Sequence, residues 1–177
     1  MFGDLHIHMI LDGVYYRAAI DAQKEHPLDG LIRARLSDYQ ARGVCLLRDG
    51  GDAWGVSLRA RELAGEYGID YRSPAFPIYR RGHYGAFIGR GFDTEDEYRA
   101  LLDEAGEKRA DFIKLMISGL IDFDHFGVLT EPGPEPQDIR RMIELAHAAG
   151  FAVMAHANGD RAVTAALQAG VDSIEHG

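Results

Sequence analysis

The sequence predicts an α/β fold in which helices cover a parallel sheet, and three observations support this. Short apolar, β-rich runs alternate with helical patterns from end to end. Helix-start and helix-stop residues separate the two kinds of segment. The chain has 177 residues, which is enough for one domain with a sizeable core. A repeated strand–helix–strand series is typical of parallel sheets.

Six segments have the composition of strands. Each is short and apolar, and polar or glycine-containing turns bound it. In chain order they are residues 4–9, 44–48, 71–78, 112–117, 152–156 and 173–176.

Helices are expected between these strands. Residues 28–40 and 56–67 precede Gly43 and Gly68. A third helix follows the capping-box pair Thr94 and Glu97. The fourth starts at Pro136, carries an apolar stripe and stops before Gly150, the stripe being Ile139, Met142, Ile143 and Ala146. In the fifth, Val163 and Leu167 repeat the pattern and Gly170 ends it.

Two longer segments, residues 79–93 and 118–135, have no regular pattern. Both follow strands, so we expect them at the carboxyl end of the sheet, where α/β enzymes bind ligands. The first contains the glycines Gly82, Gly85, Gly89 and Gly91. It lacks the strand–turn–helix context and the Lys-Ser/Thr ending of a phosphate-binding loop, so a phosphate site is not favoured.

Composition excludes several classes of function. The net charge of −9 argues against nucleic acid as a partner. No apolar run approaches the roughly 20 residues that cross a bilayer, so no membrane partner is expected. Cys45 is the single cysteine, which excludes an internal disulfide framework. Met1 leads almost directly into the first predicted strand, so no signal peptide is expected and the predicted location is cytoplasmic.

Two histidines near the N-terminus are the most informative motif. His6 and His8 alternate with Leu5, Ile7 and Met9 in a predicted strand. Successive strand side chains point to opposite faces, so the two imidazoles share one face, about 6–7 Å apart. Imidazoles held in this way can bind one metal ion or a close pair of ions.

Three further residues fall at strand positions that can face the same centre. Lys114 lies inside an apolar strand, where a lysine is costly unless it is paired or chemically altered. His156 and His176 each end a strand, one αβ unit apart. Each residue alone also has an ordinary structural explanation: a hydrogen-bonded core histidine, or a lysine that reaches the rim of the sheet.

Other polar residues are candidates for substrate contact only. Asp49 follows the second strand and is either an active-site hydrogen-bond partner or a turn residue. The two irregular segments supply further candidates, for which a solvated surface position is an equal alternative: Tyr79, Arg80, His83 and His125. His26 and His147 are expected on the surface.

The ordered set of these residues resembles the metal-dependent amidohydrolase superfamily. The resemblance rests on His-x-His in the first strand, a lysine in the fourth, and histidines ending the fifth and sixth. Residues 3–13, 156–159 and 174–177 look most like its imidazolonepropionase and dipeptidase-related branch. The resemblance spans essentially the whole chain.

The resemblance implies a TIM-type (β/α)8 barrel with its site at the carboxyl ends of the strands. His6 and His8 would bind a first metal ion, and His156 and His176 a second. Lys114, carbamylated by CO2, would bridge the two ions, which are expected to be zinc. A metal-bound hydroxide would then attack an amide or related carbonyl carbon and so cleave the carbon–nitrogen bond of a small-molecule substrate: an amide, a dipeptide or a cyclic amide.

One departure from the family pattern concerns the eighth strand, which in that family carries a catalytic aspartate. At roughly 30 residues per βα unit, this chain makes about six units, whereas whole barrels need about 250 residues. We therefore expect residues 1–177 to be strands one to six of an incomplete barrel without strands seven and eight. No catalytic residue is assignable, and we expect a homo-oligomer or a barrel completed by a missing C-terminal segment.

Two alternatives stay open. The chain could be a non-catalytic metal-binding or assembly module that another chain completes, since an open barrel leaves unpaired strand edges. Residues 4–8 also resemble the start of histidinol-phosphatase-like phosphoesterases. Lys114 and the spacing of His156 and His176 favour the amidohydrolase hypothesis.

Overall fold

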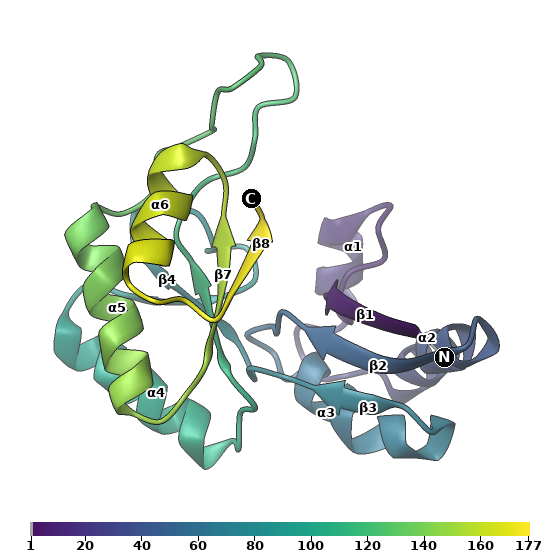
Figure 1. The fold of residues 1–177 in the computed structure, drawn as a ribbon. Helices are drawn as coiled ribbons and strands as arrows, with labels where there is room; N and C mark the ends of the chain where they lie inside the picture. The colour runs from purple at the N-terminus through teal and green to yellow at the C-terminus, as the bar shows by residue number, and fades with distance from the viewer. Residues whose placement is uncertain (1) are drawn as a thin grey trace. The chain divides into compact units, whose positions relative to one another are not determined.

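The computed structural model describes residues 2–177, which form two compact units, residues 2–76 and Pro77–Gly177. Each unit contains one parallel sheet with helices packed against it (Figure 1). The predicted α/β class with parallel strands is therefore confirmed. Over the described residues the strands form two separate sheets and do not close into a barrel.

The first unit is a three-stranded sheet in the order β1-β2-β3. Its core is formed by fully buried side chains of α2, β2 and α3, including Ile32, Leu36, Leu47 and Ala60. The elements are β1 (Phe2–Ile7), α1 (Tyr16–Asp21), α2 (Asp29–Ala41), β2 (Val44–Asp49), α3 (Val56–Ala64), the 3-10 turn η1 (Gly65–Tyr67) and β3 (Asp70–Arg72).

The second unit is a five-stranded sheet in the order β5-β4-β6-β7-β8, with α4, α5 and α6 along one side (Figure 1). Leu115 of β6 and Ala155 of β7 are register partners and are fully buried in its core. The elements are β4 (Pro77–Arg80), β5 (Arg90–Phe92), α4 (Glu95–Glu107), β6 (Ile113–Met116), α5 (Pro136–Ala148), β7 (Val153–Ala157), α6 (Asp160–Gln168) and β8 (Ser173–His176).

The capping signals of α4 and α5 act as predicted. The Thr94 hydroxyl accepts a hydrogen bond from the Glu97 backbone N–H at 3.3 Å. The Glu97 carboxylate accepts from the backbone N–H of Asp93, one residue before the expected partner. Pro136 opens α5, the predicted stripe is buried, and Gly150 follows the helix with a φ of 87°. Local hydrogen bonding and one apolar face therefore determine both helices.

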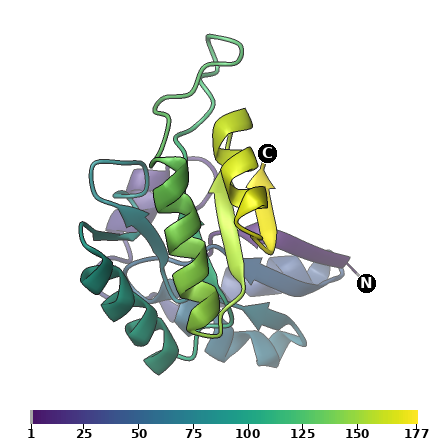
Figure 2. The same cartoon turned by 60° about the vertical axis from the view of Figure 1, so that its left-hand side comes forward.

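Helix α6 buries a different face from the one predicted. Its buried residues are Ala162, Ala165 and Ala166, whereas Leu167 is 62% exposed. Alanine has no side-chain atoms beyond Cβ, so the helix backbone can approach its neighbours closely. The prediction gave too much weight to the larger side chains. Figure 2 shows α5 and α6 side by side.

The predicted strand 71–78 is two strands that belong to different sheets. β3 ends at Arg72 and β4 begins at Pro77. Between them, Pro74 has no N–H to donate, and Ala75 has a φ of 66°, which is incompatible with an extended strand. Residues 73–78 are all buried, as in a continuous strand, but Pro74 and Pro77 are sequence signals of the interruption.

Three smaller differences concern segments with weak sequence signals. Helix α1 was not predicted, and β5 lies inside the segment expected to be irregular. The predicted helix 56–67 ends at Ala64 and continues as the 3-10 turn η1. Leu5, expected on the apolar face of β1, is 52% exposed, whereas Ile7 and Met9 are buried.

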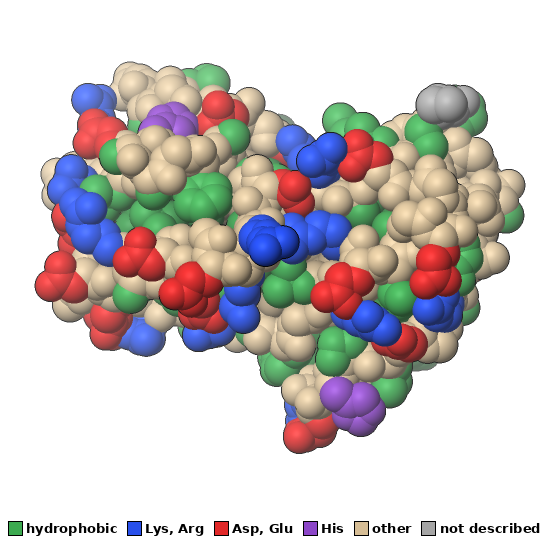
Figure 3. Space-filling model, turned by 90° about the horizontal axis from the view of Figure 1, so that it is seen from below, with side chains coloured by type: hydrophobic (Ala, Val, Ile, Leu, Met, Phe, Trp, Pro, Cys, Tyr) green, Lys and Arg blue, Asp and Glu red, His purple; other side chains and the backbone are tan. Residues whose placement is uncertain are grey.

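Basic and acidic side chains are interspersed on the face drawn in Figure 3. Ion pairs such as Arg59–Asp29 in the first unit and Arg81–Glu97 in the second join opposite charges. None of the helices among residues 2–177 combines the length and apolar composition that crossing a membrane requires.

The buried carboxylate of Asp52 holds the start of α3. It accepts hydrogen bonds from the backbone N–H groups of Trp54, Val56 and Ser57 at 2.7–3.0 Å. Burial, and then the neighbouring Asp49, raise its pKa to about 6 although these donors favour the charged form. The folded protein therefore retains a proton on Asp52 at pH values where the unfolded chain has lost it.

Asp52 should consequently make the stability of the protein depend on pH. Its contribution is fully present below about pH 4, the unfolded pKa, and is lost as the pH rises through about 6. We expect the stability of Asp52→Asn relative to wild type to increase by about 2 kcal/mol between those pH values. Urea unfolding of both proteins across the range measures this. A difference that does not vary with pH would contradict it.

Candidate metal centre

The His-x-His motif lies at the end of β1 in the first unit. His6 is in the strand and His8 follows its last residue, Ile7. The ring centroids of the two histidines are 5.4 Å apart. Both imidazoles line a groove of about 660 Å3, which Asp12, Arg35 and Tyr39 of the same unit also line. A ligand entering this groove can therefore reach both rings.

A backbone carbonyl orients the His8 ring. Its Nδ1 lies 3.1 Å from the carbonyl oxygen of Gly51. A carbonyl oxygen can only accept, so Nδ1 carries the proton, and a neutral His8 can coordinate a metal only through Nε2. Metal-binding histidines commonly make such a bond with their other nitrogen.

Asp49 holds together the chain segments that surround the His8 ring. Its side chain is fully buried and accepts from the backbone N–H of Met9 at 3.0 Å and of Gly51 at 2.6 Å. The Tyr71 hydroxyl donates to the same carboxylate. Burial raises the pKa of Asp49, and the hydrogen bonds oppose this shift. These contacts give Asp49 a positioning role at His8 rather than a place on the surface of the groove.

In the second unit, Lys114, His156 and His176 lie on the neighbouring strands β6, β7 and β8. Lys114 has no exposed surface, and all four residues of β6 are buried. Met116 is the register partner of His156, so Lys114, two residues before Met116, shares a face of the sheet with His156. The second unit thus gathers the three predicted residues along adjoining strands.

The rings of His156 and His176 meet edge to face, with centroids 4.7 Å apart. His176 ends β8 with a φ of 80°, a backbone conformation that is uncommon for residues other than glycine and that often occurs at functional sites. Burial, and then the positive charge of Lys114, lower the pKa of His176.

The His156 ring is also oriented by a carbonyl. Its Nε2 lies 3.1 Å from the Gly119 oxygen, which accepts a second bond from Asn158 Nδ2 at 2.9 Å. The Asn158 backbone N–H donates to the Ser118 hydroxyl at 2.7 Å. Asn158 Nδ2, itself a donor, also lies 3.1 Å from Nε2. Because the Gly119 oxygen can only accept, a proton on Nε2 satisfies the carbonyl contact and leaves Nδ1 as the coordinating nitrogen of a neutral His156.

An aromatic side chain covers His156. The Tyr84 ring lies 5.0 Å from the His156 ring, centroid to centroid. Glu131 holds the loop of Tyr84 in place: its carboxylate accepts from the Tyr84 backbone N–H and bonds His83 Nδ1, both at 3.0 Å. Burial raises the pKa of Glu131, but the bonds from His83 and from backbone N–H groups outweigh it, so the net shift is downward.

We expect Glu131→Ala to loosen this loop. The variant removes a charge-assisted acceptor from the Tyr84 N–H, and such bonds contribute about 1.5–3 kcal/mol. Amide hydrogen exchange at Tyr84 should therefore accelerate at least about tenfold. Glu144→Ala, at an exposed position of α5, is the matched control. An unchanged amide exchange rate at Tyr84 in Glu131→Ala would contradict the proposed role of Glu131 in holding this loop.

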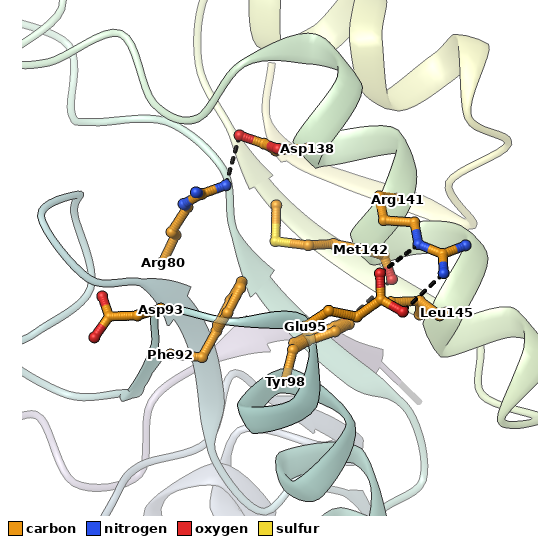
Figure 4. Close-up of a pocket in the computed structure, with 9 residues that line it drawn as sticks. All are labelled: Arg80, Phe92, Asp93, Glu95, Tyr98, Asp138, Arg141, Met142 and Leu145. Atoms are coloured by element: carbon orange, nitrogen blue, oxygen red, sulfur yellow. Dashed lines mark hydrogen bonds and ion pairs between the residues drawn. The ribbon is translucent and has the colours of Figure 1, made fainter.

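Arg80, a predicted substrate contact, lies on the other face of the sheet. It shares the face of Ile78, whose register partner is Leu115, and it pairs with Asp138 of α5 at 2.6 Å (Figure 4). This ion pair borders a cavity of about 160 Å3 between α4 and α5, which Tyr98 also lines. The placement associates Arg80 with helix packing and not with Lys114.

Tyr79 is on the same face of the sheet as Lys114. Two glycines of the predicted irregular segment, Gly85 and Gly91, lie against its side chain. A Cβ on Gly85 would lie 2.6 Å from Tyr79 Cβ, and one on Gly91 would lie 2.8 Å from Tyr79 Cζ. The glycines are needed for close packing around this ring. His83 is bonded to Glu131, and the exposed His125 pairs with Asp122 in the long loop after β6.

Several residues of the site carry no clear sequence signal. Asn158 follows a predicted ligand at a strand end, a position that could have identified it. Glu131 and the Gly119 carbonyl oxygen act through loop geometry, which no local pattern reports. Within the described chain, no group of three or more His, Cys, Asp or Glu side chains is placed to hold a metal ion. The four histidines predicted as metal ligands come as one pair in each unit.

Neither a protein-family model nor a curated protein sequence matches the chain. Solved structures do. A protein described only as uncharacterized is 25% identical, with a TM-score of 0.74 over 99% of this chain and 46% of its own. A Xaa-Pro dipeptidase with bound methionine is 20% identical, with a TM-score of 0.70 over 99% and 47%. Aspergillus niger ochratoxinase is 20% identical, with a TM-score of 0.73 over 98% and 47%.

A further solved structure, described as an amidohydrolase, is 23% identical, with a TM-score of 0.60 over 99% of this chain and 47% of its own. The chain spans about half the length of each. At such identities the likeness concerns the fold. The chain therefore has the α/β architecture of about half of each neighbour.

Proposed function

We propose that this chain is the metal-binding portion of a hydrolase that cleaves amide or other carbon–nitrogen bonds. The observation that carries the proposal is the fully buried Lys114 on the sheet face that also holds His156, beside His176. A dipeptidase and an ochratoxinase among the structural neighbours favour the same class of reaction. Dipeptides, amides and cyclic amides are the proposed substrates.

The donor groups fit divalent metal ions. We assign His6 and His8 to one ion and His156 and His176 to a second. The carbonyl bonds at His8 Nδ1 and His156 Nε2 leave a defined coordinating nitrogen on each ring. Imidazole with oxygen ligands suits zinc.

Lys114 fits the same assignment once it is carbamylated. A buried ammonium is costly, whereas the carbamate formed with CO2 is an anionic oxygen ligand that a metal ion at the His156–His176 pair would stabilise. Bound ions would lower the pKa of a water and polarise the scissile carbonyl. The chain's own residues supply orientation: Gly51 and Gly119 fix two rings, and Tyr84 covers His156.

Turnover belongs, in this proposal, to a complete barrel, because the chain spans about half the length of its structural neighbours. A carboxylate outside the described strands would move the proton of the attacking water. A homo-oligomer or a further C-terminal segment would complete the site.

Hydrolysis assays of the zinc- and bicarbonate-loaded protein, with the segment that completes its barrel present, test this function. Xaa-Pro dipeptides, cyclic amides and phosphate monoesters form the substrate panel. We expect turnover of carbon–nitrogen substrates that a chelator abolishes. Turnover confined to phosphate monoesters, or insensitive to the chelator, would contradict the proposal. Zinc binding without turnover would favour a metal-binding module that another chain completes.

A further inference from the structure

The turn after β2, Asp49 to Gly51, brackets His8 on three sides. The Gly50 N–H donates to the Ile7 carbonyl at 2.7 Å, just before His8. The Asp49 carboxylate accepts from the Met9 N–H, just after it. The Gly51 carbonyl bonds the ring at Nδ1. One short turn thus holds the backbone on both sides of His8 and the imidazole itself.

Gly50 lies directly against the imidazole. A Cβ at this position would lie 2.4 Å from His8 Cε1, 2.7 Å from Nε2 and 3.1 Å from Nδ1. The φ of Gly50 is outside the left-handed region, so its backbone does not itself require glycine. The close approach of the ring is therefore the reason that no side chain fits there.

The neighbouring Gly51 has little room to move away. It has a φ of 82°, and a Cβ there would lie 2.9 Å from both Phe76 Cα and Pro74 Cγ. Its N–H is held by Asp49 at 2.6 Å. A methyl group added at Gly50 would consequently displace the ring rather than the turn.

We propose that Gly50 is a positioning residue for His8: its missing side chain lets the imidazole lie on the turn with Nδ1 on Gly51 and Nε2 toward the metal. This role rests on the proposed function, because metal binding is what requires a fixed orientation of the His8 ring. Gly50 would then influence the metal affinity of His8 without coordinating the metal itself.

A double-mutant cycle tests the contact without any metal. Gly50→Ala should lower the urea midpoint of wild type but leave that of the His8→Ala variant unchanged, since the clashing ring is then absent. Should Gly50→Ala alone fail to fold, recovery of the fold in the double variant gives the same result. An equal loss in both backgrounds, or a double variant that does not fold, would overturn the proposal.

Two further readouts separate orientation from simple packing. Nitrogen-15 NMR of the metal-free chain, well above the ordinary imidazole pKa, should show the His8 proton on Nδ1. The zinc affinity should fall at least about tenfold in Gly50→Ala. It should be unchanged in Gly30→Ala, where a Cβ meets no atom within 4 Å. A proton on Nε2, or undiminished affinity in Gly50→Ala, would overturn the positioning role. If wild type binds no zinc, the proposed function fails, but the double-mutant cycle still tests the contact between Gly50 and the His8 ring.

Discussion

Replacing Lys114 with methionine should abolish binding of the second zinc ion without weakening the metal-free fold. Methionine has a similar volume and no charge, and Lys114 has no exposed surface. A lysine ammonium without exposed surface is costly to bury, and an apolar side chain of similar volume removes that desolvation cost. The carbamate ligand is lost, so zinc affinity at the His156–His176 pair should fall at least about a hundredfold.

Zinc titration and urea unfolding of the metal-free protein measure the two effects separately. Lys108→Met is the matched control, because Lys108 lies at the exposed C-cap of α4. It should change neither quantity appreciably. A Lys114→Met protein that keeps its zinc affinity but unfolds at much lower urea concentration would show that Lys114 is a structural residue.

Asp49→Ala should produce the largest loss of stability in the first unit. The substitution leaves the Met9 N–H, the Gly51 N–H and the Tyr71 hydroxyl without their buried acceptor. Each buried unsatisfied donor costs about 1–3 kcal/mol. Because neighbouring effects are not additive, we expect a total loss of roughly 3–5 kcal/mol.

Thermal and urea unfolding measure this loss, with Asp38→Ala as the control. Asp38 lies on α2 with its side chain 75% exposed, so its removal should change stability by less than about 0.5 kcal/mol. Asp49→Asn should fall between wild type and Asp49→Ala, since an amide keeps one acceptor oxygen. Equal stability of Asp49→Ala and Asp38→Ala would refute the role of the carboxylate as a hydrogen-bonding hub.

Much of the fold was predictable because the signals are local. Thr94, Pro136 and Gly150 delimit α4 and α5 through capping and backbone geometry. Pro74 and Pro77 mark the break between β3 and β4 in the sequence, but its geometry was not predictable in this way. It depends on the positive φ of Ala75, and alanine carries no signal for that conformation. Tertiary contacts impose it within a run of residues that are all buried.

The candidate site was likewise predictable only in part. Strand alternation placed His6 and His8 together, and the strand ends placed His156 near His176. The surrounding groups could not be predicted, because Gly119 and Glu131 act from loops whose paths depend on long-range packing. Arg80 shows the converse: a cation in a promising loop sequence lies on the helix-covered face, because alternation along β4 directs it there.

Anomalous X-ray scattering from zinc-loaded crystals grown with bicarbonate would locate the metal ions and show the chemical state of Lys114. We predict two zinc ions, one within about 2.1 Å of His8 Nε2 and one within about 2.1 Å of His156 Nδ1. His6 and His176 complete the two pairs, and a carbamate on Lys114 is bound to zinc. Zinc bound elsewhere, or histidine pairs without zinc beside an unmodified Lys114, would contradict the account.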